Sequence, residues 1–237
     1  FSNLPKRYEI LPPIKVKATD FGAPTTRTRA FFIGYDPKKF RSNVSWDNFL
    51  PPPNVTKIFV QKALYGLPVN IQPERIIGDF GWQRMEMALD GFPESFYVKA
   101  AASIPPTVGN LEWIERYWNG EVSGCLSTKH SPEVAARYKA LTFGQQDNIS
   151  KSIKLNPDGF CPTLRAGTGR EKGSYQAVRP IHYEMPRVIT PREAARLQGF
   201  PDWFVFQPTI WHSFRQIGNS VSPIVAEKIL HILHNAI

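Results

Sequence analysis

Residues 186–223, PRVITPREAARLQGFPDWFVFQPTIWHSFRQIGNSVSP, contain the signals from which the fold can be predicted. Thr190 is a favourable N-cap residue, and Pro191 suits the first position of a helix. Glu193 stands where the second member of a capping box belongs. Gly199 can adopt the left-handed conformation that ends many helices. These residues predict a helix that begins after Thr190 and ends at Gly199.

The rest of this stretch predicts a pair of arginines, a turn and a last helix. Arg192 and Arg196 are four residues apart, so we expect them to share one helix face and to reach outward together. Residues 216–221 (QIGNSV) predict a turn that contains glycine. Ser222 and Pro223 then favour the start of an apolar helix that reaches residue 237.

Shorter patterns predict the other elements. Alternating or apolar runs favour strands, Gly and Pro favour turns, and a 3.6-residue apolar period favours helices. The predicted strands are residues 14–18, 30–33, 96–98 and 111–114, with a turn at residues 21–24. The predicted helices are residues 54–64, capped by Asn54, and residues 131–141, which begin at Ser131-Pro132.

Three blocks of this sequence resemble a known family. Residues 190–202 (TPREAARLQGFPD) and 215–223 (RQIGNSVSP) resemble the ninth and tenth conserved blocks of DNA (cytosine-5) methyltransferases. Residues 20–34 (DFGAPTTRTRAFFIG) are similar to the eighth block, which places two arginines two residues apart. The blocks occur in the family's order.

The resemblance implies an α/β fold in which a small target-recognition domain is inserted into part of a doubly wound, Rossmann-like methyltransferase domain. Residues 1–36 would then be strands of the large catalytic domain. Residues 37–205 would form the target-recognition domain, including the ninth block. Residues 206–237 would return to the large domain as the tenth block and the closing helix.

Arg27 and Arg29 are the candidate catalytic residues. On an extended strand they would point the same way, because side chains alternate with a period of two. Taken alone, the pair could equally be two solvated arginines at a strand edge. The resemblance implies that Arg29 hydrogen-bonds the flipped cytosine and that Arg27 supports that site. Thr25 stands where the family usually has glutamine, so no role is carried over to it.

Residues 160–183 combine glycines with basic side chains, a pattern that suits close approach to a phosphate backbone or to guanine edges. A solvated surface loop is the alternative interpretation of the same composition. The resemblance favours DNA recognition, since Thr163-Leu164 matches a pair that the family has shortly before its ninth block. The predicted DNA-binding residues are Arg165, Gly167, Arg170, Lys172, Tyr175, Gln176, Arg179, Arg187 and Arg192.

The cofactor implied by the resemblance is S-adenosylmethionine. Asn219, Ser220 and Val221 would line one wall of its pocket. A structural interpretation is also open, because Asn is tolerated in left-handed turns and Ser can satisfy a backbone group.

Composition limits the class of protein. The 237 residues carry a formal charge of +9 and a pI near 9.6, which favours a polyanionic partner such as double-stranded DNA. No run of about 18 apolar residues is present, so we expect no membrane span. Cys125 and Cys161 are expected to be buried thiols in a reducing compartment, and the histidines show no metal-ligand spacing. We expect a prokaryotic, cytoplasmic, nucleoid-associated protein.

Three features of the family's chemistry do not occur in these 237 residues: the Pro-Cys block with the nucleophile, the Glu-Asn-Val block and the Phe-x-Gly-x-Gly cofactor loop. The sequence is therefore expected to be the C-terminal part of the enzyme and to be inactive without an N-terminal catalytic half or a partner subunit. The resemblance implies a place in a restriction-modification system, but the sequence does not show whether a restriction endonuclease is paired with this chain. The alternatives are a non-catalytic DNA-binding or scaffold subunit and a basic domain without a DNA role.

Overall fold

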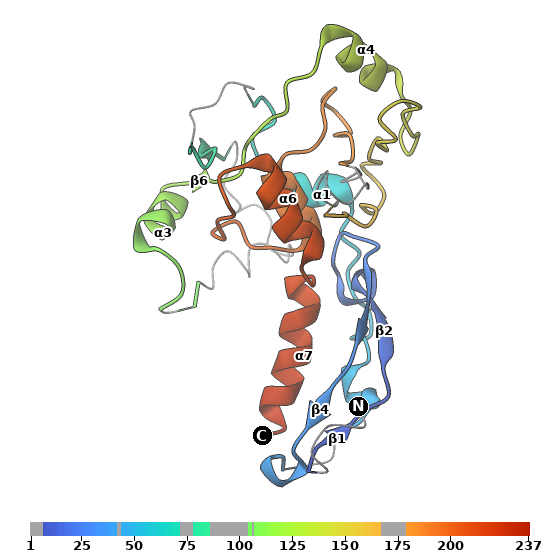
Figure 1. The fold of residues 1–237 in the computed structure, drawn as a ribbon, viewed down its shortest axis with the longest axis vertical. Coiled ribbons are helices and arrows are strands. Elements are labelled where there is room, and N and C mark those ends of the chain that lie inside the picture. Colours follow the sequence, from blue (N-terminus) through green and yellow to red (C-terminus); the bar gives the residue numbers. More distant parts are fainter. Residues whose placement is uncertain (1–6, 42–43, 72–77, 86–103, 106, 167–178) are drawn as a thin grey trace, which may run out of the picture.

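The computed structural model describes residues 7–41, 44–71, 78–85, 104–105, 107–166 and 179–237 (Figure 1). Its strands are Glu9–Ile10 (β1), Ile14–Lys17 (β2), Thr28–Phe31 (β3), Gly34–Tyr35 (β4), Gln83–Arg84 (β5) and Glu121–Val122 (β6). Its α-helices are Val60–Leu64 (α1), Leu111–Trp118 (α3), Pro132–Ala140 (α4), Pro191–Gln198 (α5), Ile210–Asn219 (α6) and Pro223–Asn235 (α7). The 3₁₀ helices are Ala18–Phe21 (η1), Pro37–Lys39 (η2) and Trp46–Phe49 (η3).

The N-terminal strands form an extended ribbon beside the last helix. β2 pairs with β3 and β1 pairs with β4, both antiparallel, with Val16 opposite Arg29. α7 extends from the central helices along this ribbon (Figure 1). Phe21 and Phe49 pack with Val225 and Ile229 of α7, so the two ends of the chain share one hydrophobic core.

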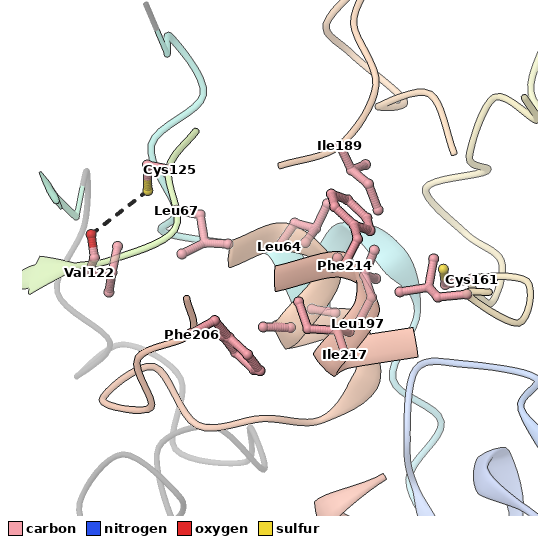
Figure 2. Close-up of a cluster of buried hydrophobic side chains, with 14 of the residues drawn as sticks. Leu64, Leu67, Val122, Cys125, Cys161, Ile189, Leu197, Phe206, Phe214 and Ile217 are labelled. Carbon is pink, nitrogen blue, oxygen red and sulfur yellow. Dashed lines mark hydrogen bonds between the residues drawn. The ribbon is translucent and has the colours of Figure 1, made fainter. Parts of the chain in front are cut away.

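A second core surrounds α5 and α6, which pack on each other and on α1. Figure 2 shows its side chains converging from segments that are far apart in sequence. Leu197 and Ile217 are fully buried in it, together with Leu64, Cys161 and Phe214. The centre of the molecule thus contains side chains of residues 186–223, the stretch on which the sequence prediction was based.

α5 forms for the reasons that its sequence predicts. The Thr190 side chain accepts a hydrogen bond from the Glu193 backbone, and the Glu193 carboxylate accepts one from the Thr190 N–H at 2.7 Å. Gly199 ends the helix with φ +91°. A Cβ there would lie 2.8 Å from Ile224 Cδ1, so the glycine also lets α5 approach α7 closely.

Two smaller units lie at the periphery. α3 packs against β6, which pairs antiparallel with β5. α4 is capped by Ser131, whose hydroxyl accepts a hydrogen bond from Val134 N, as the sequence predicts. It lies at the far end of the molecule from α7 (Figure 1).

Two local predictions are wrong, and a third cannot be compared with the structure. Residues 111–114 are helical, not extended, because Asn110 caps a helix in which Ile114 and Tyr117 bury one side. Asn54 caps no helix: its φ is +61°, and α1 begins only at Val60. The strand predicted at residues 96–98 lies outside the described residues.

The predicted turn at residues 216–221 is also wrong at its start, because α6 continues through Asn219. Gly218 is a helical residue here. A Cβ on it would lie 2.6 Å from Ala166 N, so the glycine permits contact between two backbones and does not form a turn. The chain leaves the helix at Ser220.

The described residues contain only two-stranded antiparallel sheets, so the doubly wound parallel sheet that the resemblance implies is not formed by this part of the chain. The division into residues 1–36, 37–205 and 206–237 stays a prediction. One core contains residues of α1, α5 and α6, and the other contains residues of α7 and of the N-terminal ribbon.

Candidate functional site

Arg27 and Arg29 lie on one face of the β2–β3 ribbon, as their period-two spacing predicts. Both line a small hollow together with Val221 and Ser222, which follow α6. Residues from the two ends of the chain therefore meet in one place. The hollow is completed by Val16, Ala18, Phe31 and Val225.

Arg27 is not a solvated side chain, since only 1% of its surface is exposed. Its guanidinium donates to Leu164 O at 3.1 Å and to Gly218 O at 2.7 Å. No ion pair to Arg27 occurs among the described residues, and its Nε has no hydrogen-bond partner there. Burial, with the nearby charge of Arg29, lowers the pKa of Arg27 to about 10. Arg27 therefore still carries its charge at neutral pH. In the described part of the chain, this charge is stabilised only by hydrogen bonds to backbone carbonyls.

Arg29 is half-buried and less constrained. Its guanidinium donates to the carbonyl of its neighbour Thr28 at 2.9 Å. Arg27 therefore fixes the strand against Leu164 and Gly218, whereas Arg29 presents a cation at the hollow. The predicted roles of Arg27 and Arg29 toward a flipped base stay predictions.

The three residues predicted to line a cofactor wall do not face one cavity. Asn219 lines an open cavity of about 340 Å³ together with Gln207, His212, Arg215 and Gln216. The Ser220 hydroxyl donates to Ile217 O at 2.8 Å, so it caps the end of α6. Val221 lines the arginine hollow. Ser222, which the sequence prediction omitted, borders the same hollow with a buried hydroxyl that lacks a partner among the described residues.

The Thr163-Leu164 pair lies where Arg27 reaches across from the ribbon. Leu164 is buried, and its carbonyl accepts from Arg27. Arg165 is exposed and lines a cavity of about 470 Å³ with Thr163 and Lys151. The remaining lining residues are Gln146, Ile153, Pro162 and Pro180.

Of the other predicted DNA contacts, five lie outside the described residues: Gly167, Arg170, Lys172, Tyr175 and Gln176. Arg179 is half-buried. It donates to Thr128 Oγ1 at 3.2 Å and its guanidinium lies 5.0 Å from the ring centre of Phe214. It is therefore held against the protein.

Arg187 and Arg192 do not face a ligand, which corrects their assignment as DNA contacts. Arg187 is 7% exposed and donates to both oxygens of Glu193, at 2.9 and 2.7 Å. Arg192 is fully buried and donates to Ser123 O at 2.6 Å and to Phe204 O at 2.7 Å. Their donors are used to join α5 to neighbouring loops.

Arg196 likewise points inward, so the prediction that it reaches outward with Arg192 is wrong. It donates to both carboxylate oxygens of Asp202, and both residues are almost completely buried. Burial by itself would raise the pKa of Asp202, but attraction to Arg196 and Arg192 outweighs it and lowers that pKa. The helical spacing of the arginines predicted a shared face but could not show that every residue of α5 would be buried.

Cys125 and Cys161 are buried free thiols, as predicted. Burial raises the pKa of Cys125 to about 12, and burial raises the pKa of Cys161 as well. A thiol is nucleophilic only as the thiolate. Neither cysteine is therefore suited to attack a substrate at neutral pH.

Among the described residues, no group of three or more His, Cys, Asp or Glu side chains could hold a metal ion. Within the same residues, every helix is too short or too polar to cross a bilayer.

Comparisons with known proteins agree with the resemblance of the three blocks. Residues 8–235 match the model of the family described as C-5 cytosine-specific DNA methylase. The type II methyltransferase M.XorII of Xanthomonas oryzae pv. oryzae is 47% identical over 227 residues, which are 94% of this chain and 50% of that protein. The type II methyltransferase M.HgiCI of Herpetosiphon aurantiacus is 43% identical over 105 residues, 44% of this chain and 23% of that protein.

A solved structure is also similar. It is a candidate DNA modification methyltransferase encoded within an E. coli prophage, with a TM-score of 0.84 and 48% sequence identity. The match covers 97% of this chain and 61% of that one. This chain thus spans about half the length of M.XorII and less than two thirds of the solved protein.

Proposed function

This chain belongs to the C-5 cytosine-specific DNA methylase family, and we propose that it forms the sequence-reading and base-holding part of a DNA cytosine-5 methyltransferase. Its reaction would move a methyl group from S-adenosylmethionine to C5 of a cytosine flipped out of double-stranded DNA. The type II methyltransferases among its relatives support a role in a prokaryotic restriction-modification system, acting on cytoplasmic DNA.

One observation carries this proposal: Arg29 and Arg27 lie beside Val221 and Ser222, around a hollow of only about 10 Å³ at the surface of which a base could be held. It joins the eighth and tenth blocks, which the family's chemistry requires to lie together. Arg29 offers a rigid fork of donors that matches the acceptor edge of a pyrimidine better than a lysine would. Arg27 holds the strand by its bonds to Leu164 and Gly218.

The nucleophile would come from outside these residues. Attack on C6 of cytosine requires a thiolate, and burial keeps both thiols of this chain protonated. We therefore propose that an N-terminal catalytic half, on the same polypeptide or on a partner subunit, supplies the Pro-Cys block. Arg29 would then hold the extruded base in place while the bond to sulfur forms.

The residues present fit a site for S-adenosylmethionine only in part, because Asn219 and Ser222 line separate cavities. Ser222 Oγ is a buried hydroxyl without a partner among the described residues. Asn219, which is close to Ser222 in sequence, lines an open cavity. Both are uncharged hydrogen-bonding groups that suit a zwitterionic amino acid moiety. When bound, the cofactor supplies an electrophilic methyl group. Asn219 would hydrogen-bond it in the open cavity, whereas Ser222 and Val221 border the arginine hollow.

Reconstitution tests the proposal. The chain is mixed with a polypeptide that bears the Pro-Cys block, complex formation is confirmed, and transfer of tritiated methyl groups to duplex DNA is measured. We expect Arg29→Ala to lower turnover by roughly a hundred-fold, in the range found when one transition-state donor is removed, with little change in duplex affinity. Arg84→Ala, at an exposed arginine of β5, is the matched control and should change neither.

A confirmed complex that binds DNA without methyl transfer would instead support a non-catalytic DNA-binding or scaffold subunit. If Arg29→Ala weakened duplex affinity but left turnover intact, Arg29 would be a phosphate contact. Duplex binding itself should weaken with salt, because Lys and Arg contacts release counterions.

A further inference from the structure

A hairpin-shaped loop at residues 144–154 has its tip outside both hydrophobic cores. It lies in the predicted target-recognition domain, but the sequence analysis named none of its residues as DNA contacts. Gly144 N donates to Lys154 O at 2.8 Å, Lys154 N donates to Gln145 O at 2.9 Å, and Asp147 N donates to Ser152 O at 2.8 Å. Gln146 and Ile153 form an antiparallel bridge between the two arms. The hairpin lies at the outer margin of the molecule beside α4 (Figure 1).

The tip, residues 148–151, is held in one shape by Asp147. This carboxylate is buried and accepts from Arg137 Nε of α4 and from Ser150 N, both at 2.6 Å. Lys151 N donates to Asp147 O at 3.0 Å and Lys151 adopts φ +58°. The tip is thus braced from inside the protein and needs little ordering when a ligand binds.

The braced tip presents its side chains to solvent. Asn148, Ser150 and Lys151 are exposed, and Ile149 is 73% exposed. Because the Ile149 side chain is exposed on an otherwise polar tip, it does not stabilise a hydrophobic core. Amide, hydroxyl and ammonium groups read the donors and acceptors of base edges, and an aliphatic group contacts the thymine methyl.

The charge around the tip favours a polyanion over a protein partner. Residues 137–154 contain Arg137, Lys139, Lys151 and Lys154 against the single acid Asp147, whose charge Arg137 already neutralises. Lys151 and Arg165 line the cavity between the hairpin and the segment that follows Pro162, and no carboxylate occurs among the described residues of its lining.

We propose that the 144–154 hairpin enters the major groove of the target duplex and that Asn148 and Ile149 read base edges there. Lys151 and Arg165 hold the adjacent phosphate strand in the cavity between them. The major groove, about 12 Å wide, admits a two-stranded ribbon of this kind. This inference rests on the proposed function, because it specifies how the same chain selects its DNA sequence.

The test is a selection from 30-bp duplexes whose ten central base pairs are random, with binding measured at several salt concentrations. The wild-type chain should select a consensus. Asn148→Ala and Ile149→Ala should each reduce the preference at one or two positions by roughly ten-fold, the usual effect of losing a base contact, while affinity for the unselected library stays the same. Leu111→Ala, at a side chain 76% exposed on α3, is the apolar control and should leave the consensus unchanged.

Lys151→Asn removes the charge and keeps a residue that tolerates a positive φ. It should weaken binding to all sequences alike and lower the salt slope by about one, whereas Lys57→Asn at an exposed loop lysine should not. Circular dichroism melts would confirm that each variant folds.

The outcomes separate the two proposals. If the wild type selects a consensus and the Asn148 and Ile149 variants select the same one, the hairpin does not read bases and only this inference fails. A uniform loss of affinity in those variants, or a change in oligomeric mass without an effect on DNA, has the same consequence. Salt-insensitive binding without any consensus in the wild type would overturn the proposed function as well.

Discussion

Asp202→Asn is expected to destabilise the protein strongly through a change of one atom. Asp202 is 2% exposed and its carboxylate accepts from Arg196 Nε at 2.9 and 3.0 Å. Arg192 Nη1 lies 3.7 Å from the same carboxylate. Asparagine has nearly the same shape but no charge, so the variant leaves two buried guanidinium groups without their shared counter-ion.

The magnitude follows from the burial of both partners. Removing one member of a buried ion pair costs roughly 3–5 kcal/mol, because the remaining charge is left uncompensated. That is a large part of the 5–15 kcal/mol that stabilises a typical domain. For a chain of this length each kcal/mol lowers the melting temperature by about 2–4 °C, so a decrease of roughly 6–20 °C is expected.

The effect also has a defined pH dependence. Attraction to Arg196 and Arg192 outweighs burial and holds the pKa of Asp202 below its ordinary value. The ion pair therefore contributes fully above the unfolded pKa of about 4 and is lost as the pH falls through the folded pKa. The difference between wild type and variant should be constant from about pH 5 to about pH 8 and should shrink in more acidic solution.

Urea titrations and thermal melts followed by circular dichroism measure both effects. Asp158→Asn, at an exposed aspartate, is the matched control and should change the free energy of unfolding by less than about 0.5 kcal/mol. If Asp202→Asn melts within error of the wild type, the buried network does not stabilise the fold. A difference that grows on acidification would contradict the assigned direction of the pKa shift.

Three other substitutions or treatments test separate parts of the structure. Gly218→Ala would place a Cβ 2.6 Å from Ala166 N, so urea titrations should show a decrease of about 1–3 kcal/mol in the free energy of unfolding. Gly34→Ala is the control, because the atom nearest to its Cβ is 3.6 Å away. Equal effects of the two substitutions would argue against the close contact at Gly218. Iodoacetamide at pH 8 should leave Cys125 and Cys161 unlabelled in the folded chain and label both in urea; rapid labelling of the folded chain, read by mass spectrometry, would contradict their burial. Arg165→Ala should lower the salt slope of duplex binding by about one without altering sequence choice, and an unchanged slope would remove Arg165 from the phosphate contacts.

Local signals in the sequence predicted local structure well. The Thr190 capping box and Gly199 mark the two ends of α5, and Ser131 marks the start of α4, because each acts within a few residues of itself. The Arg27 and Arg29 spacing likewise predicted a shared face, since strand alternation is a local property.

Long-range partners could not be predicted in the same way. Nothing in the spacing of Arg192 and Arg196 shows that Ser123 and Asp202 would be their partners, so both were expected in solvent. Gly218 was interpreted as a turn residue because the approach of Ala166, 52 positions earlier, cannot be read from neighbouring residues. Basic side chains are ambiguous for this reason: some pair with buried acids and others are exposed to solvent.

Arg27 connects the two halves of the candidate function. One guanidinium binds Leu164 O, next to the exposed Arg165, and Gly218 O, next to the turn that carries Val221. Because Arg29 follows on the same strand face, it cannot shift without moving either the segment around Leu164 or the end of α6. A hydrogen bond to a charged donor contributes about 1.5–3 kcal/mol, so two of them make this junction more rigid than packing alone would. Contact of Arg165 with the DNA backbone and placement of Arg29 beside the flipped base would therefore occur together, in a single arrangement of these three segments.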